Sequence, residues 1–81
     1  MYDTDMVSAN FEDLLLTITK HGEYWRARVE EIDDPDSALT DGTDYASPDR
    51  AKRGAMTIAL DLFGTSVPEE ELQWRSTPMD R

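Results

Sequence analysis

The segment from Ser47 to Gly64 constrains the fold of this chain most strongly, because signals for both ends of one helix enclose a helical apolar repeat. Ser47 is a favoured N-cap residue, Pro48 suits the first helical position, and Gly64 suits the left-handed residue after a helix. Apolar residues recur between these ends at helical spacing, at Ala51, Ala55, Ile58, Ala59 and Leu62. The pattern predicts one helix over residues 48–63, with an alanine-rich face that allows close approach to a sheet.

Two segments before this helix alternate apolar and polar residues, which is typical of strands. They are separated by a short turn, residues 20–23, in which Gly22 can adopt a positive φ. A connection this short predicts an antiparallel hairpin. One face of the hairpin would carry Leu14, Leu16, Ile18, Trp25, Ala27 and Val29. The helix is the expected cover for that face.

The predicted fold class is α+β: an antiparallel β-hairpin or three-stranded sheet covered by one α-helix. Residues 38–40 are the candidate third strand, and residues 72–76 are a candidate short C-terminal edge strand. Residues 30–37 are expected to form an acidic loop, because Pro35 and the surrounding aspartates disfavour a central strand. We expect residues 1–10 to be a flexible acidic N-terminus, 11–76 a single domain, and 77–81 a frayed C-terminus.

The formal charge of the 81-residue chain is −10, from 18 Asp and Glu against 8 Lys and Arg. A field of this sign repels nucleic-acid phosphates and speeds encounter with basic proteins. Adaptation to high salt would give a similar composition. The chain has no cysteine, no apolar run near the ~18 residues of a membrane span, and an acidic start unlike a secretory signal. We therefore expect a cytoplasmic protein that binds neither nucleic acid directly nor a membrane.

Catalytic and metal-binding patterns are weak. His21 is the only histidine, so a catalytic triad or a histidine-based metal site lacks its partners. The carboxylates do not follow the order of a calcium-binding loop, and the four glycines are isolated rather than arranged around a phosphate. We expect no enzyme activity, no catalytic residue, no metal and no cofactor.

The strongest candidate binding surface is acidic. Seven carboxylates fall within fifteen residues with no basic residue among them: Glu30, Glu31, Asp33, Asp34, Asp36, Asp41 and Asp44. Such a density costs stability through repulsion, and a surface that meets Lys and Arg would tolerate that cost. The alternative is a solvated loop in a generally acidic protein. A second candidate surface is formed by Tyr24, Arg26 and Arg28 on the outer face of the second strand, because exposed Tyr and Arg are typical of protein interfaces.

The order of these elements resembles the N-terminal domain of HicB-type antitoxins. Residues 19–29 resemble the first hairpin of that family, residues 40–47 resemble its turn before the helix, and residues 51–62 resemble its alanine-rich helix. The proline-containing exit of the family resembles residues 64–68. The resemblance implies a domain that clasps a small basic ribonuclease toxin and covers its active site.

The sequence therefore leaves three alternative functions open. The first is a non-enzymatic inhibitor of a basic nucleic-acid-acting protein, either a toxin ribonuclease or a defence effector, of the HicB-like antitoxin type. The second is a phage-encoded anti-CRISPR or anti-restriction protein that mimics nucleic acid. The third is a ligand-binding or structural domain of a halophile. Homodimer formation is compatible with each of them.

Overall fold

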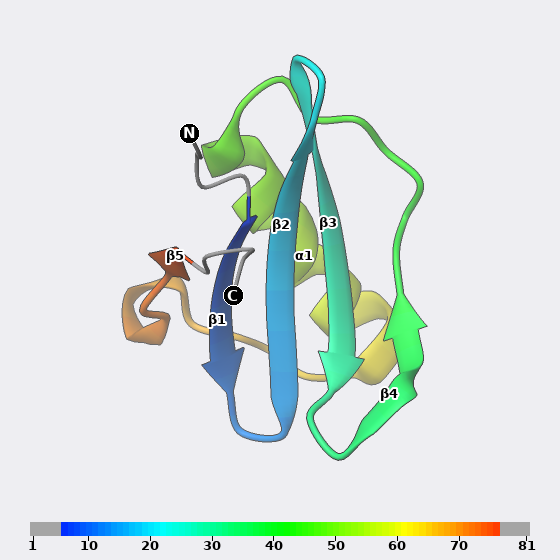
Figure 1. Cartoon of the computed structure of the whole chain (residues 1–81). Helices are drawn as coiled ribbons and strands as arrows, with labels where there is room; N and C mark the ends of the chain where they lie inside the picture. Colours follow the sequence, from blue (N-terminus) through cyan, green and yellow to red (C-terminus); the bar gives the residue numbers. More distant parts are fainter. Residues whose placement is uncertain (1–5, 77–81) are drawn as a thin grey trace.

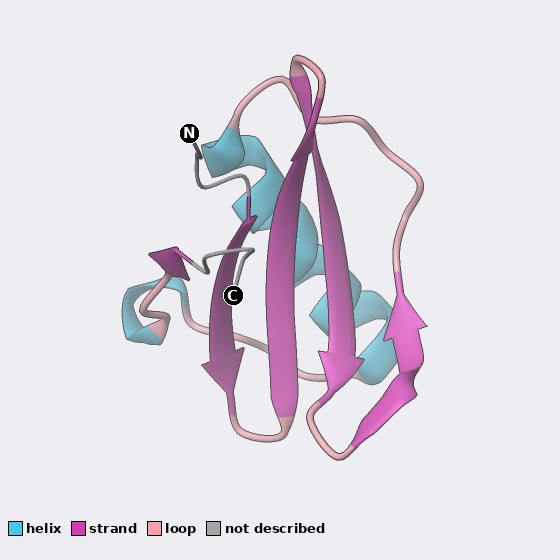
Figure 2. Cartoon of the chain, viewed as in Figure 1, coloured by secondary structure: helices cyan, strands magenta, loops and turns pink. Residues whose placement is uncertain are grey.

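The computed structural model describes residues 6–76, which form an antiparallel sheet of five strands with one helix on one face (Figure 1). The strands are β1 (Met6–Phe11), β2 (Leu14–His21), β3 (Tyr24–Glu31), β4 (Asp34–Leu39) and β5 (Arg75–Ser76), in the spatial order β4-β3-β2-β1-β5. The helix α1 (Pro48–Phe63) and a short 3-10 helix η1 (Glu69–Glu71) lie between β4 and β5 in the chain (Figure 2). The predicted α+β class is confirmed, with more strands than expected.

Local signals account for both ends of α1, and the predicted bounds are confirmed. The Ser47 hydroxyl accepts a hydrogen bond from the Arg50 backbone N–H at 3.2 Å, which satisfies one of the free donors of the first turn. At the other end Gly64 has a φ of 71°, and its N–H donates to the Leu60 carbonyl at 3.1 Å.

The core lies between α1 and the central strands β2 and β3. The largest side chains with no solvent exposure are Leu16, Ile18 and Val29. The helix contributes Ala51, Ala55, Ile58 and Ala59, all buried. The prediction that the helix covers the hairpin is confirmed, with Trp25 half-buried at the margin of the core. Leu62 is the exception, because its side chain remains 53% exposed.

The N-terminal part of the chain differs from the expectation. Residues 6–10 were expected to be flexible, but they belong to β1, which pairs along its length with β2. The physical reason is a short alternation in which Ala9 is buried at 3% exposure and Val7 and Phe11 pack against the core. The apolar alternation of this strand is weak, because its residues are small or only moderately apolar, and it directly follows the acidic start of the chain. Residues 1–5 and 77–81 lie outside the described residues.

The expected loop over residues 30–37 is also wrong. β3 continues to Glu31, the chain turns at Ile32 and Asp33, and β4 begins at Asp34. Pro35 is tolerated because β4 is an edge strand, whose outer side forms no ladder bonds with a described strand. Of the candidate third strand, residues 38 and 39 form the end of β4, and residue 40 lies outside it. The candidate edge strand at residues 72–76 is confirmed in a shorter form, β5, which pairs with β1.

Tyr45 ties the connection between β4 and α1 to both layers. Its backbone exchanges two hydrogen bonds with Trp25 of β3, at 2.7 and 2.8 Å. Its ring lies against Gly54 of α1, where an added Cβ would come 2.9 Å from the Tyr45 Cε2 atom. The Tyr45 hydroxyl donates to the Asp41 carboxylate. Burial, and then the hydrogen bond to Asp41, raise the pKa of Tyr45 above its ordinary value.

This contact predicts a change of sign between two backgrounds. Gly54→Ala should lower the free energy of unfolding by about 1–3 kcal/mol, because the new methyl group must displace the Tyr45 ring. In a Tyr45→Ala background the same substitution should raise it by roughly 0.5–1 kcal/mol, since alanine is the better helix former. Denaturant unfolding of the four proteins measures both effects. Equal effects in the two backgrounds would contradict the contact.

Candidate protein-binding surface

Two acidic turns lie side by side at one end of the sheet. Glu12 and Asp13 form the turn between β1 and β2, and Ile32 and Asp33 form the turn between β3 and β4. Figure 1 shows both turns at its lower end. The Ile32 N–H donates to the Asp13 carbonyl at 2.8 Å, so the turns are joined directly. We call the carboxylate cluster at this end the acidic tip; it consists of Glu12, Asp13, Glu31, Asp33, Asp34 and Asp36.

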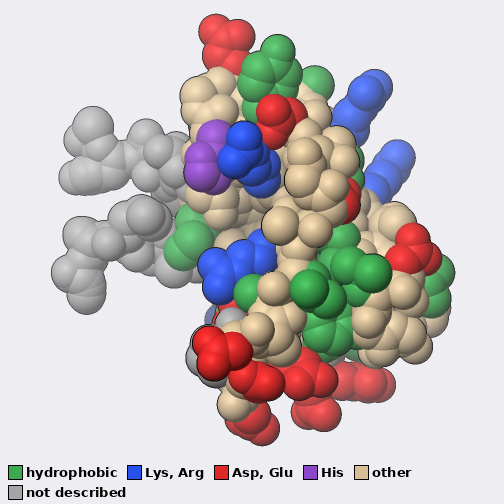
Figure 3. Space-filling model, turned by 90° about the vertical axis from the view of Figure 1, so that its right-hand side faces the viewer, with side chains coloured by type: hydrophobic (Ala, Val, Ile, Leu, Met, Phe, Trp, Pro, Cys, Tyr) green, Lys and Arg blue, Asp and Glu red, His purple; other side chains and the backbone are tan. Residues whose placement is uncertain are grey.

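The negative charge of the acidic tip has no counter-ion within the described residues. All six carboxylate residues are exposed, and neither of the two ion pairs of the described chain involves them. Figure 3 shows Asp and Glu side chains gathered at this end. Neighbouring charges of one sign interact over a screening length of about 8–10 Å at ordinary ionic strength. The acidic tip can therefore attract Lys and Arg side chains of another molecule.

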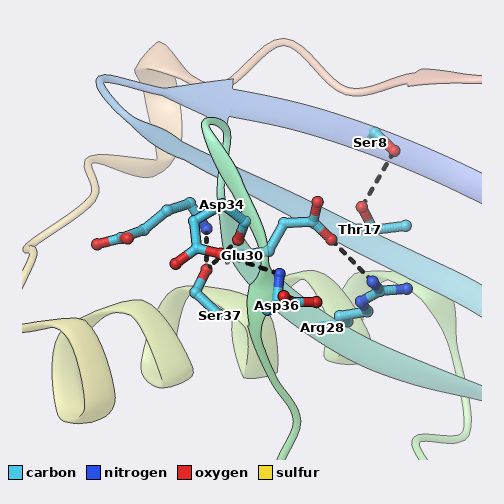
Figure 4. A network of polar contacts seen from close by, with 8 residues as sticks. Ser8, Thr17, Arg28, Glu30, Asp34, Asp36 and Ser37 are labelled. Carbon is cyan, nitrogen blue, oxygen red and sulfur yellow. Dashed lines mark hydrogen bonds and ion pairs between the residues drawn. The ribbon is translucent and has the colours of Figure 1, made fainter.

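A few polar contacts hold the β3–β4 hairpin in shape and leave most of its carboxylates free (Figure 4). The Ser37 hydroxyl accepts from the Glu31 backbone N–H and donates to the Asp34 carbonyl, both at 2.7 Å. The Asp34 carboxylate accepts from the Asp36 backbone N–H at 3.2 Å. No side-chain hydrogen bond within residues 6–76 uses the carboxylates of Glu31, Asp33 or Asp36.

An exposed apolar residue lies between two of these carboxylate residues in the chain. Ile32 is 46% exposed and is flanked by Glu31 and Asp33. Protein interfaces commonly combine an apolar centre with a polar rim. The acidic tip therefore offers both parts of such a surface.

The structure separates three of the predicted acidic residues from this surface. The Glu30 side chain is only 16% exposed and pairs with Arg28 at 2.9 Å, on the sheet face away from α1 (Figure 4). Asp44 pairs with Arg26 at 2.8 Å. Asp41 accepts from the Thr43 N–H at 3.0 Å and from the Tyr45 hydroxyl. These three carboxylates serve contacts within the chain.

The direction of the chain explains the separation. β4 runs antiparallel to β3, so the residues after β4 return toward the start of β3. There Tyr45 pairs with Trp25, at the opposite end of β3 from Glu31. Asp41 and Asp44 therefore lie away from the acidic tip, although they are close to Asp36 in sequence.

Glu12 and Asp13 are the residues that the sequence-based prediction missed. They lie almost twenty residues before Glu31. Only the pairing of Leu14 with Glu31 in the β2–β3 register brings the first turn beside the second. The predicted hairpin contained the signal for this proximity. In an antiparallel meander successive turns alternate between the two ends of the sheet, so the turn before β2 and the turn after β3 lie at the same end.

The second predicted surface, Tyr24, Arg26 and Arg28, lies on the sheet face away from α1. Its residues are exposed, and Tyr24 is 51% exposed. Both arginines already hold carboxylates of this chain, Asp44 and Glu30. The surface is therefore nearly neutral in itself and offers less unpaired charge than the acidic tip.

No group of three or more His, Cys, Asp or Glu within residues 6–76 is arranged to hold a metal ion. A shallow hollow of about 410 Å³ lies toward the edge of the sheet opposite β4. Residues of β1 and the C-terminal segment line it, including Asn10, Gln73 and Arg75. Among the described residues, no helix is long and apolar enough to cross a membrane; α1, with 16 residues, is the longest.

Repulsion within the acidic tip predicts a salt-dependent stability. The combined substitution Glu31→Gln, Asp33→Asn and Asp36→Asn should raise the Tm at low salt, because these carboxylates have no counter-ion. The gain should shrink in strong salt, since the screening length falls from about 30 Å at about 0.01 M to about 3 Å at about 1 M. Glu23→Gln, in the turn at the other end of the sheet, is the control and should change the Tm less. A gain that is the same at both salt concentrations would exclude repulsion as its cause.

Comparisons with known proteins do not assign this surface. Protein-family models, curated proteins and solved structures contain no match to the chain.

Proposed function

We propose that this protein is a small, acidic, non-enzymatic inhibitor that acts in the cytoplasm on a basic nucleic-acid-acting protein. The acidic tip would dock on the positively charged surface with which that partner holds nucleic acid. Occupying this surface would block access of the nucleic acid, so inhibition would need no chemical step.

One observation carries this proposal: six exposed carboxylates lie at the same end of the sheet as an exposed isoleucine and have no counter-ion in the described chain. Two arginines elsewhere in the described chain hold carboxylates, Arg26 with Asp44 and Arg28 with Glu30. Unpaired like charges reduce stability, and a basic partner would remove that penalty on binding. The rim charges would steer the encounter, and Ile32 would supply apolar contact at the centre.

The distribution of charge also favours this function over general adaptation to salt. Of the residues in the described chain, the face of the sheet away from α1 carries Arg26, Arg28 and Arg75, whereas the acidic tip carries no basic residue. Adaptation to high salt acts on the whole surface and gives no reason for such separation. A local cluster is instead typical of a surface that meets an oppositely charged partner.

Among basic nucleic-acid-acting proteins, we favour a ribonuclease toxin as the partner. The reason is the resemblance of residues 19–29, 40–47 and 51–62 to the N-terminal domain of HicB-type antitoxins. A defence effector that grips DNA would present similar chemistry to the acidic tip. The identity of a captured partner distinguishes the two.

The kinetics of binding test the proposal. A partner is captured from the native host with the immobilised protein and identified by mass spectrometry, and its association is then followed by surface plasmon resonance. The combined variant Asp33→Asn, Asp34→Asn and Asp36→Asn should lower the on-rate at low salt by about tenfold or more and flatten its salt dependence. The dissociation rate should change less, because the charges are exposed.

The matched control is the combined variant Glu23→Gln, Glu69→Gln and Glu70→Gln, which removes the same net charge from exposed positions outside the acidic tip. Its on-rate should stay close to that of the wild type. Equal on-rates for wild type and the tip variant would exclude the acidic tip as the docking surface. A partner without a basic surface would contradict the proposed class of partner.

Direct nucleic-acid binding provides a separate prediction. The isolated protein should not bind duplex DNA or RNA at physiological salt, because its net charge of −10 opposes release of counterions from the phosphates. Fluorescence anisotropy with labelled duplexes measures this. Micromolar binding with a steep salt dependence would instead assign a function to the basic residues near the start of α1, which are Arg50, Lys52 and Arg53.

A further inference from the structure

The layer between sheet and helix is open along β4. Leu39 of β4 lies opposite Val29 of β3 in the sheet register, so both side chains point toward the helix layer. Val29 is fully buried, whereas Leu39 is 40% exposed. The difference arises because α1 makes its main contacts with β2 and β3.

The last turn of α1 presents a second apolar side chain to the same opening. Leu62 follows Ile58 by four residues and Ala55 by seven, so the three share one face of the helix. Ile58 is 2% exposed, but Leu62 is 53% exposed. Figure 1 shows α1 crossing behind the sheet so that its C-terminal end lies near β4. Figure 3 looks onto this side and shows exposed hydrophobic side chains directly above the acidic ones.

β4 also has an unpaired backbone edge. It is the outermost strand beside β3, whereas the opposite side of the sheet ends in β5. An edge strand exposes backbone N–H and C=O groups that can pair with an extended segment of another molecule. Leu39 lies on this strand and the C-terminal end of α1 lies near it (Figure 1), so an added strand could bury its inward side chains on Leu39 and Leu62.

The charge around the opening selects the occupant. β4, the connection from β4 to α1 and the last turn of α1 contain no Lys, Arg or His, and Arg26 and Arg28 of the neighbouring β3 lie on the other face of the sheet, where they pair with Asp44 and Glu30. Asp34 and Asp36 lie on β4 itself, and Asp61 lies next to Leu62; all three are exposed. A second copy of this chain would bring the same carboxylates to the same edge, and like charges on an edge strand oppose such self-pairing. A basic segment would be attracted.

We propose that β4 accepts an extended, basic segment of the partner protein by strand addition, with apolar side chains of that segment on Leu39 and Leu62 and its Lys or Arg side chains on Asp34, Asp36 and Asp61. This inference deepens the proposed function, since it rests on a basic partner and extends the contact from the acidic tip, to which Asp34 and Asp36 belong, along β4 to Leu39 and α1. The acidic tip supplies long-range attraction, and the β4 edge supplies backbone pairing and apolar burial. A basic protein with such an extended segment would therefore bind more tightly than a basic protein without one.

The experiment is an NMR titration of the isotope-labelled protein with short synthetic peptides. The main probe alternates valine and lysine. One comparison peptide alternates serine and lysine, which keeps charge and backbone but removes apolar contact. A second carries N-methyl groups on alternate backbone amides of the valine–lysine peptide, which prevents strand pairing. A third alternates valine and glutamate.

We expect the valine–lysine peptide to shift the amide signals of residues 37–40 and the methyl signals of Leu39 and Leu62. N-methylation should weaken binding by about tenfold or more, because several backbone hydrogen bonds are lost. Leu62→Ser should weaken binding while leaving the fold intact, since Leu62 is largely exposed. Leu60→Ser, equally exposed at 53% but on another face of α1, is the matched control and should leave binding unchanged.

Three results would overturn strand addition. Shifts confined to the two turns of the acidic tip would leave the proposed docking surface in place but exclude β4. Equal binding of the N-methylated peptide would exclude backbone pairing. Equal binding of the valine–glutamate peptide, or absence of binding by every peptide, would exclude a basic occupant at this edge. The proposed function fails separately, when the on-rate of the captured partner does not depend on the acidic tip.

Discussion

The structure depends on the contact between the alanine-rich face of α1 and the inner face of the β2–β3 hairpin. Ala51, Ala55 and Ala59 are fully buried and let the helix approach the sheet closely. The area that this single helix covers then determines which strands have buried side chains. β1 completes the covered area through Ala9, whereas β4 lies outside it and retains an exposed Leu39. In a domain of this size, where only roughly 60% of the chain surface can be buried, one helix cannot cover the whole sheet.

The connections between the antiparallel strands also determine where the negative charge gathers. They place the β1–β2 and β3–β4 turns at one end, joined by the Ile32 to Asp13 hydrogen bond, and so collect the carboxylates of the acidic tip. The opposite end holds the connection that Tyr45 fastens to β3 and α1, and its carboxylates bind partners within the chain. Unpaired charge and uncovered apolar surface therefore both occur beside β4. The proposed binding role of this side of the molecule rests on that coincidence.

The parts of the fold that could be predicted are those with complete local signals. The helix was found to the residue, because Ser47, Pro48 and Gly64 mark its ends. The β2–β3 hairpin was found because its alternation is long and its turn contains Gly22. β1 and the first half of β4 were missed, since a short strand is stabilised mainly by the neighbour with which it pairs. In β4, Pro35 and the aspartates resemble a loop, and only the position at the sheet edge makes them acceptable in a strand.

The sequence by itself determined the sign and density of the charge, the helix, the central hairpin and the presence of an acidic binding candidate. Those properties reside in residue identity and short spacing, which need no knowledge of distant contacts. Only the tertiary structure decided which carboxylates act together. It added Glu12 and Asp13 to the surface and assigned Glu30, Asp41 and Asp44 to internal contacts. The reason is that strand register and chain direction, rather than distance along the sequence, determine which charges meet within a screening length.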